Sequence, residues 1–201
     1  AGSKFVNISN STTASATNDI ITGTTAADNI DALGGNDTVF GLGGDDTITG
    51  GGGDDVLWGG ADTDMAYYAN GALSSYAFSL LDDSGTVRVD GSAAGSGIDT
   101  LHEMELVRLD SIASIYNLIA GTGGDDTLNV SSYRNLILAG GGADAIALSS
   151  TSETYLIMTG AQADYTIAHD DATSTYTITG AGTDVKTVTG TGLLNVKFTD
   201  G

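Results

Sequence analysis

Apolar positions recur every nine residues along two stretches of the chain. Written in nines from Ala14, the first stretch reads ASATNDIIT, GTTAADNID, ALGGNDTVF, GLGGDDTIT, GGGGDDVLW and GGADTDMAY. The eighth place of each nonapeptide is apolar: Ile21, Ile30, Val39, Ile48, Leu57 and Ala66. This spacing predicts a turn of six residues followed by a short strand whose middle side chain points inward.

A second stretch begins at Ile112 and reads IASIYNLIA, GTGGDDTLN, VSSYRNLIL, AGGGADAIA and LSSTSETYL. Its eighth places are Ile119, Leu128, Ile137, Ile146 and Tyr155. The two stretches are out of phase, so they are separate arrays. Such short strands cannot bury a face alone, but stacked copies form a continuous core. Two nonapeptides then close one coil, and alternate nonapeptides lie on the same side.

The sixth place carries most of the candidate chemistry. In the first array Asp28, Asp46 and Asp64 stack on one side, and Asp19, Asp37 and Asp55 on the other. In the second array this place holds Asn117, Asp126, Asn135, Asp144 and Glu153. Carboxylates about 4 Å apart repel by about 1 kcal/mol even in water, and a divalent cation between them reverses the sign. Glycines at places one to four let backbone carbonyls reach the same ion. An all-oxygen ligand set favours calcium over zinc or copper.

Composition supports a cation-binding protein and excludes other classes. The 201 residues carry a formal net charge of −20, with twelve aspartates and no basic residue between Lys4 and Arg88. Such a surface repels nucleic acid and anionic membranes. The absence of cysteine excludes disulfides, thiolate zinc sites and cysteine nucleophiles. No apolar run approaches the length of a membrane span, so we expect none.

The nonapeptides GLGGDDTIT and GGGGDDVLW resemble the RTX, or haemolysin-type calcium-binding, repeat family, whose core pattern is G-G-x-G-x-D-U-x. The resemblance covers about half of the chain. It implies a parallel β-roll with calcium between turns n and n+2, bound by the sixth-place aspartates of both. Carbonyls of places two and four in one turn, and of places one and three in the later turn, complete the shell.

Carried over residue by residue, the resemblance implies several calcium ions at four sites. Each site pairs two aspartates with four carbonyls: Asp37 and Asp55 with Leu33, Gly35, Gly50 and Gly52; Asp46 and Asp64 with Leu42, Gly44, Gly59 and Ala61; Asp28 and Asp46 with Thr24, Ala26, Gly41 and Gly43; Asp126 and Asp144 with Thr122, Gly124, Ala139 and Gly141.

Some nonapeptides depart from the pattern. ASATND has no glycine, which makes a site between Asp19 and Asp37 doubtful. VSSYRN and LSSTSE lack both glycine and aspartate, so we expect no calcium on that side of the second roll. Asn117 and Asn135 are expected to form an uncharged ladder there.

The remaining segments alternate apolar and polar residues around Asp, Ser and Gly turns, which predicts a hairpin and a further strand in each. Residues 76–111, and more loosely 164–201, resemble a segment that often follows RTX repeats. We therefore expect an all-β protein with two parallel β-rolls, each followed by an antiparallel β cap. The predicted boundaries are 14–67 for the first roll, 68–111 for its cap, 112–156 for the second, degenerate roll and 157–201 for its cap. The ending KFTDG lies within the family motif, which predicts a fragment of a longer protein.

Other residue types give no sign of an active site. His102 and His169 lie in different segments, and the pairs Asp82–Asp83 and Asp170–Asp171 lie at predicted hairpin turns, where aspartate is favoured. No G-x-S-x-G motif occurs. Four aromatic residues either form a sugar-stacking face or, as we favour, cover the seam between roll and cap: Trp58, Tyr67, Tyr68 and Tyr76. We expect no enzymatic activity.

The resemblance implies a calcium-binding structural module of a secreted bacterial protein, exported unfolded by a type I system and folded by calcium outside the cell. One hypothesis is a cell-surface protein of the S-layer or adhesin type, with self-association or surface polysaccharide as partners. The alternative is the non-catalytic C-terminal region of a type I-secreted protease, lipase or polysaccharide-modifying enzyme. The motifs of the full-length protein would separate the two.

Overall fold

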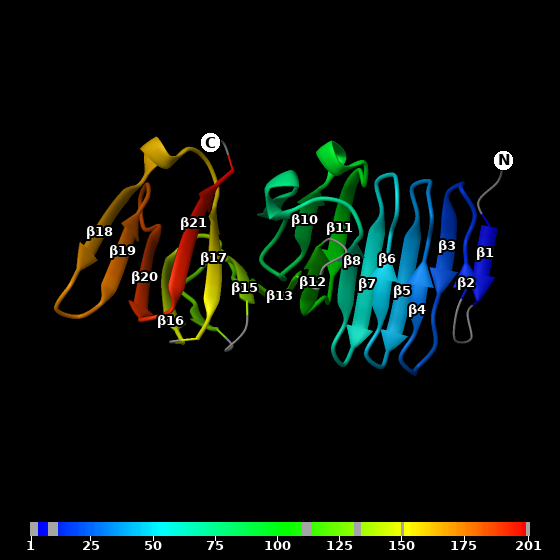
Figure 1. Cartoon of the computed structure of the whole chain (residues 1–201), viewed down its shortest axis with the longest axis horizontal. Coiled ribbons are helices and arrows are strands. Elements are labelled where there is room, and N and C mark those ends of the chain that lie inside the picture. The colour runs from blue at the N-terminus through cyan, green and yellow to red at the C-terminus, as the bar shows by residue number, and fades with distance from the viewer. Residues whose placement is uncertain (1–3, 8–11, 110–113, 131–133, 150, 200–201) are drawn as a thin grey trace. The chain divides into compact units, whose positions relative to one another are not determined.

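A computed structural model describes residues 4–7, 12–109, 114–130, 134–149 and 151–199 (Figure 1). The regular structure of the described residues consists of strands and three single-turn 3-10 helices, joined by turns and loops. The chain divides into two compact units. Unit 1 comprises 1–78 and 86–115, and unit 2 comprises 79–85 and 116–201. Among the described residues, no helix has the length and apolar character needed to cross a membrane.

The repeats of unit 1 wind into a parallel β-roll. Successive strands alternate between two sheets, so that strands of every second nonapeptide pair in parallel. One sheet contains β1 (Lys4–Asn7), β3 (Asp19–Thr22), β5 (Thr38–Gly43) and β7 (Val56–Ala61). The other contains β2 (Thr12–Thr13), β4 (Asn29–Asp31), β6 (Thr47–Thr49) and β8 (Met65–Tyr68). The all-β fold with parallel strands that the period predicts is confirmed.

The register places the eighth-place side chains on top of one another. Val39 lies opposite Ile21 in β3 and opposite Leu57 in β7, and Ile48 lies opposite Ile30 in β4. The eighth-place side chains of this array are at most 1% exposed. The core of the roll is therefore a stack of aliphatic side chains between the two sheets.

The segment expected to cap the first roll adds another coil to it. It forms η1 (Leu73–Ser75), β9 (Ala77–Leu80), β10 (Val87–Asp90), η2 (Ser92–Ala94), β11 (Ile98–His102) and β12 (Leu106–Leu109). β11 pairs in parallel with β7, with Leu101 opposite Leu57, and β12 pairs in parallel with β8, with Val107 opposite Ala66. β10 then pairs antiparallel with β11. β11 and β12 extend the roll because Leu101 and Val107 supply the same buried apolar position as the repeats.

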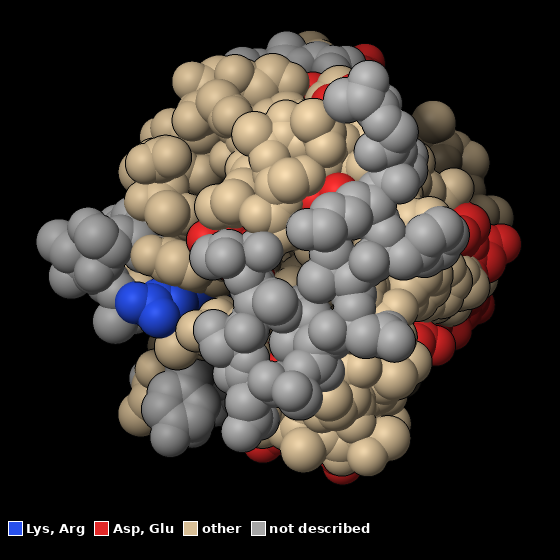
Figure 2. All heavy atoms as spheres, turned by 90° about the vertical axis from the view of Figure 1, so that its right-hand side faces the viewer, with Lys and Arg blue, Asp and Glu red and all other residues tan. Residues whose placement is uncertain are grey.

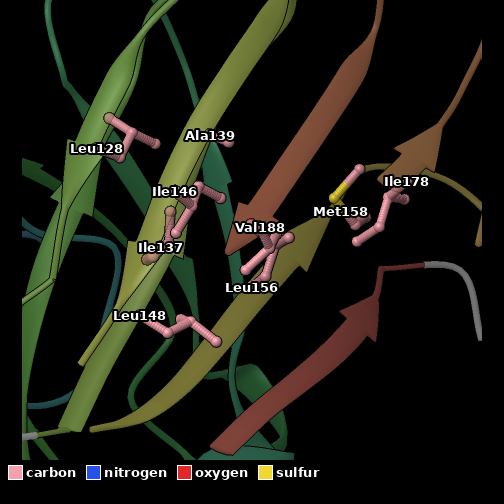
Figure 3. Close-up of a cluster of buried hydrophobic side chains, with 9 residues drawn as sticks. All are labelled: Leu128, Ile137, Ala139, Ile146, Leu148, Leu156, Met158, Ile178 and Val188. Atoms are coloured by element: carbon pink, nitrogen blue, oxygen red, sulfur yellow. The ribbon is translucent and has the colours of Figure 1, made fainter. Parts of the chain in front are cut away.

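Unit 2 combines parallel and antiparallel strands. β13 (Ser114–Ala120), β15 (Arg134–Leu138), β17 (Glu153–Met158) and β21 (Leu193–Phe198) pair in parallel. A second sheet runs in the order β14 (Thr127–Asn129), β16 (Ala143–Leu148), β20 (Val185–Gly190), β19 (Thr175–Thr179) and β18 (Thr166–Asp170). Its first three strands are parallel, its last two pairings are antiparallel, and η3 (Gln162–Asp164) precedes β18. Aliphatic side chains of both sheets form the core (Figure 3).

The last nonapeptide of unit 2 is out of the expected phase. Asn135 lies opposite Thr154, not Glu153, and Ile137 lies opposite Leu156, not Tyr155. Because side chains alternate along a strand, a shift of one residue exchanges the two faces. Leu156 is therefore fully buried in the core, and the expectation that Tyr155 points inward is wrong. The Tyr155 ring instead packs edge-on against Tyr116, with 5.8 Å between ring centroids.

Candidate metal centre

The sixth-place aspartates of unit 1 form two buried ladders. On one side, the N–H of Asp19 donates to Oδ1 of Asp37 over 2.7 Å, and that of Asp37 to Oδ1 of Asp55 over 2.8 Å. On the other side, the N–H of Asp28 donates to Oδ1 of Asp46, and that of Asp46 to Oδ1 of Asp64. All six side chains are at most 4% exposed. The two aspartates of every site predicted in unit 1 therefore lie in adjacent layers of one ladder.

The turn backbone sets up these ladders. In the nonapeptides that begin at residues 32, 41, 50 and 59, places two and four lie in the left-handed region, for example Leu42 (φ 86°) and Gly44 (φ 92°) in one turn. Gly60 and Asp62 of the coil two turns later also have positive φ angles. Glycine adopts this region without strain, which accounts for its recurrence at these places. Leu33 and Leu42 adopt it with their side chains exposed.

One carboxylate oxygen in each later rung lacks a hydrogen-bond partner. The Oδ2 atoms of Asp37, Asp46, Asp55 and Asp64 are buried and accept no hydrogen bond. A buried charge without a partner costs several kcal/mol. In this respect the ladders fit a cation between successive layers.

Place-one glycines leave room for oxygens of two stacked turns. A Cβ on Gly41 would lie 2.2 Å from Oδ2 of Asp46 and 2.5 Å from the carbonyl oxygen of Gly59, two turns later. A Cβ on Gly59 would meet Oδ2 of Asp64 at 2.6 Å and the carbonyl oxygen of Glu103 at 2.2 Å. Carboxylate and carbonyl oxygens thus converge beside each glycine. This donor set suits a hard, oxygen-liganded ion such as calcium.

The pKa values show how poorly solvated the ladders are. Burial raises the pKa of Asp55 and Asp64 to about 6 and that of Asp99 to about 7. Neighbouring carboxylates raise these values further, as Asp37 does for Asp55 and Asp46 does for Asp64. Hydrogen bonds from the backbone of the preceding rung oppose the increase. The ladders therefore stabilise a positive charge, either a metal ion or protons.

Two members of these ladders were missed in the sequence. The N–H of Asp55 donates to Oδ1 of Asp99 over 3.0 Å, and that of Asp64 to Oε2 of Glu105 over 2.9 Å. Residues 94–102 read AGSGIDTLH, which is itself a nonapeptide with Asp99 at its sixth place. Gly95 and Gly97 have positive φ angles at places two and four, as in the repeats. Writing the cap segment in nines would have identified Asp99, whereas Glu105 follows a shortened turn and has no such signal.

The acidic ladder of unit 2 is shorter. The N–H of Asp126 donates to Oδ1 of Asp144 over 2.9 Å, which joins the two predicted ligands. Oδ2 of Asp126 accepts hydrogen bonds from the N–H and hydroxyl of Thr122. A Cβ on Gly121 would lie 2.3 Å from the carbonyl oxygen of Ala139 and 3.0 Å from Oδ2 of Asp126. The same convergence of oxygens thus occurs between these two layers.

The opposite side of unit 2 carries neutral side chains, as expected. Nδ2 of Asn117 donates to Oδ1 of Asn135 over 3.4 Å and to the carbonyl oxygen of Arg134 over 3.1 Å. Nδ2 of Asn135 donates to the hydroxyl of Thr154 in the next layer. Amide and hydroxyl groups hydrogen-bond to one another along this side.

Several predicted carbonyl ligands are engaged in backbone pairing. The carbonyl oxygens of Leu33, Gly52 and Thr122 accept N–H groups of Gly52, Gly35 and Gly141 at 2.9–3.0 Å. A carbonyl oxygen has a second lone pair that a cation can use. Within the described part of the chain no three His, Cys, Asp or Glu side chains converge. Carbonyls would therefore have to supply much of the shell, and the full ligand assignment stays a prediction.

The residues considered for catalysis or sugar binding in unit 1 pack against neighbouring side chains. His102 stacks on Trp58 with 3.7 Å between ring centroids and 6° between ring planes, and Phe40 continues the stack on β5. Tyr68 and Tyr76 are buried against each other, and Arg108 lies over the ring of Tyr67.

The remaining histidine and two of the turn aspartates also have partners within the fold. His169, which lies in unit 2, contacts Asp171 at 2.8 Å and stacks on Tyr176. Asp82 and Asp170 each accept an N–H two residues later, as expected of turn residues.

Surface charge agrees with the composition. Figure 2 looks onto the end of unit 1 where β1 and β2 lie, and acidic side chains gather along its right-hand edge. Basic side chains are visible only at the opposite edge of this face. Such a surface attracts cations before any ion reaches the ladders.

Stacked coils with buried acidic ladders define a parallel β-roll whose inward carboxylates are suited to cations. Residues 13–48, 33–66 and 120–150 match the RTX calcium-binding nonapeptide repeat, so these segments are repeats of this family. The repeats identify a calcium-binding module of a type I-secreted, extracellular protein.

No curated protein matches the chain. Among solved structures, the extracellular lipase LipA from Serratia marcescens is similar over 91% of this chain, at 15% identity and a TM-score of 0.26. The matched region covers 38% of the lipase chain.

Proposed function

We propose that this chain is a calcium-dependent folding module of a bacterial cell-surface protein of the S-layer or adhesin type. The buried, unpartnered carboxylate oxygens of Asp37, Asp46, Asp55 and Asp64 carry the proposal. These groups oppose folding when no cation is bound and favour it when calcium fills the ladders. The module itself performs no catalysis.

The two arginines of unit 1 support a requirement for an external ion. Arg88 pairs with Asp90 at 2.9 Å, and Arg108 lies over Tyr67. Among the described residues, neither arginine forms an ion pair with a ladder carboxylate. Calcium is then the counter-charge that the first roll needs, and its binding energy becomes folding energy.

A role in export and assembly follows from the same chemistry. Charge repulsion keeps a chain with net charge −20 extended where calcium is scarce, and the absence of cysteine removes any need for oxidation. Outside the cell, calcium would fold the module. Its remaining acidic surface could then bridge through calcium to another copy or to anionic polysaccharide.

Light scattering with and without millimolar calcium, beside binding to surface polysaccharide, tests the assembly role. We expect calcium-dependent growth in mass or calcium-dependent glycan binding. A monomer that binds no glycan at saturating calcium would contradict the surface role and favour the alternative, the non-catalytic region of a secreted enzyme. Protease, esterase and glycosidase assays should all be negative, and turnover that survives repurification would contradict a purely structural module.

A further inference from the structure

The acidic ladder of unit 2 ends in a lysine. β20 pairs in parallel with β16, and the register places Lys186 opposite Asp144. The side chain of Lys186 is 1% exposed. We propose that the ammonium group of Lys186 replaces a calcium ion in the last layer of this ladder, so that this layer forms without metal.

The position of Lys186 corresponds to that of Asp99 in unit 1. Residues 181–189 read AGTDVKTVT and align with AGSGIDTLH at 94–102, with Lys186 and Asp99 at the sixth place. Gly182 and Gly95 at place two both have positive φ angles, and the eighth-place side chains, Val188 and Leu101, are buried in both units. The same layer therefore ends in a carboxylate in one unit and an ammonium in the other.

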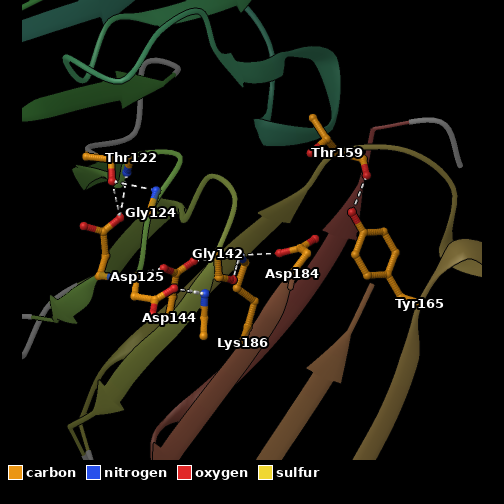
Figure 4. A network of polar contacts seen from close by, with 11 residues as sticks. Thr122, Gly124, Asp125, Gly142, Asp144, Thr159, Tyr165, Asp184 and Lys186 are labelled. Carbon is orange, nitrogen blue, oxygen red and sulfur yellow. Dashed lines mark hydrogen bonds and ion pairs between the residues drawn. The ribbon is translucent and has the colours of Figure 1, made fainter. Parts of the chain in front are cut away.

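The oxygens around Lys186 are of the kind predicted to bind calcium (Figure 4). Nζ lies 2.6 Å from Oδ2 of Asp144 and donates to the carbonyl oxygen of Gly142 over 3.2 Å. It also forms an ion pair with Oδ1 of Asp184. Asp144 and Gly142 hold places six and four of one turn, which are ligand places in the RTX pattern. Three oxygens match the three N–H donors of an ammonium group.

The ammonium group of Lys186 neutralises the carboxylate of Asp144 without an external ion. In unit 1, Oδ2 of Asp55 occupies the corresponding rung and has no hydrogen-bond partner. In unit 2, the covalently attached ammonium is present in every folded chain, whatever the calcium concentration. The inference rests on the proposed role of calcium, and it leaves Asp126–Asp144 as the one candidate calcium site on this ladder among the described residues.

Two substitutions separate calcium replacement from an ordinary buried ion pair. K186D restores the carboxylate that Asp99 provides in unit 1, and we expect it to bind one more calcium ion per chain than the wild type. K186M removes the charge and keeps much of the chain length. Because it leaves Asp144 and Asp184 without their cation, we expect its melting temperature to fall by about 10 °C in EGTA. Millimolar calcium should largely restore it, because the ion can occupy the vacated position.

Bound calcium would be counted by equilibrium dialysis with atomic emission, and stability by thermal melts. K197M is the matched control, since Lys197 lies on β21 of the other sheet of the same unit, and it should change neither the ion count nor the calcium response. If the wild type binds calcium but K186D binds no additional ion, the inference is wrong. The inference is also wrong if K186M lowers the melting temperature equally in EGTA and in calcium. Either result would leave the proposed function standing. A wild-type chain that binds no calcium would overturn the proposed function and the inference together.

Discussion

The N–H of Asp55 donates to Oδ1 of Asp99 over 3.0 Å, although 44 residues separate them in the sequence. This bond continues a ladder whose other rungs are 18 residues apart. The first roll therefore extends beyond residues 13–66, the part that matches the repeat family. A segment between β8 and β11 is looped out, and the coil then resumes in register.

The D99N variant tests whether this extra layer binds calcium. Asparagine keeps an oxygen for the N–H of Asp55 but removes the charge, so we expect the loss of about one bound ion per chain. The melting temperature should fall in calcium and rise in calcium-free buffer, because one buried negative charge is gone. D171N removes a charge at a side chain that is 97% exposed, and it should change neither quantity. The same melting temperature shift with and without calcium would contradict the prediction.

Removal of calcium should unfold the first roll. We expect EGTA to reduce the β-strand signal in circular dichroism strongly and calcium to restore it, since cation binding offsets repulsion along the ladders. Magnesium should restore little, because it demands stricter octahedral geometry and gives up water reluctantly. A spectrum and melting temperature unchanged after exhaustive chelation would show that the roll does not need the ion.

Substitutions in the two units should have unequal effects. Asp46 is bonded to both Asp28 and Asp64 in its ladder, whereas Asp144 lies between Asp126 and Lys186. D46N should therefore remove about two ions per chain and D144N about one. Ion counts by dialysis would measure the difference. Equal losses would mean that ions do not lie between successive rungs as the ladder predicts.

We expect glycine to be required at place one because a Cβ would not fit there, and not because of its backbone conformation. A Cβ in G41A would lie 2.2 Å from Oδ2 of Asp46, so we expect at least tenfold weaker calcium binding at the neighbouring sites. G43A is the matched control in the same turn, because its Cβ would meet only Ala61, at 3.8 Å or more. Isothermal titration with calcium compares the two. Equal affinities in G41A and G43A would contradict a site beside Gly41.

Acid should stabilise the calcium-free chain. Burial raises the pKa of Asp55 and Asp64 to about 6 and that of Asp99 to about 7, above the ordinary aspartate value of 3.8. The folded state then binds protons more tightly than the unfolded chain, so the free energy of unfolding falls as pH rises from about 4 to about 7. In calcium-depleted buffer we expect a higher melting temperature near pH 5 than near pH 7.5.

Calcium should reverse this dependence, because the ion binds the ionised carboxylates and protons compete with it. Melts at both pH values with millimolar calcium provide the comparison, and we expect the gain in melting temperature from calcium to be larger near pH 7.5. A melting temperature that rises with pH in calcium-depleted buffer would contradict the assigned shifts.

The sequence by itself determined the repeating part of the fold. A nine-residue period with one inward apolar side chain and one aspartate at each turn is compatible with few folds. The reason is that the direction of a side chain in a strand depends only on its position along that strand. The stacking of Ile21 on Val39 and of Asp37 on Asp55 follows from that period alone. The match of these turns to the calcium-binding repeat depends on the same local pattern.

Only the tertiary structure decided which residues complete the ladders. Asp99, Glu105 and Lys186 lie 41 to 44 residues after their respective partners Asp55, Asp64 and Asp144, with looped-out segments between them. Residue spacing does not predict the partner across such an interruption, since the pairing of strands then depends on which strand packs at the open end of the sheet. The shift that buries Leu156 instead of Tyr155 has a similar cause, because one additional residue changes the face while leaving the composition intact. Whether a buried carboxylate meets an ammonium group or no partner at all is likewise a matter of contacts between distant strands.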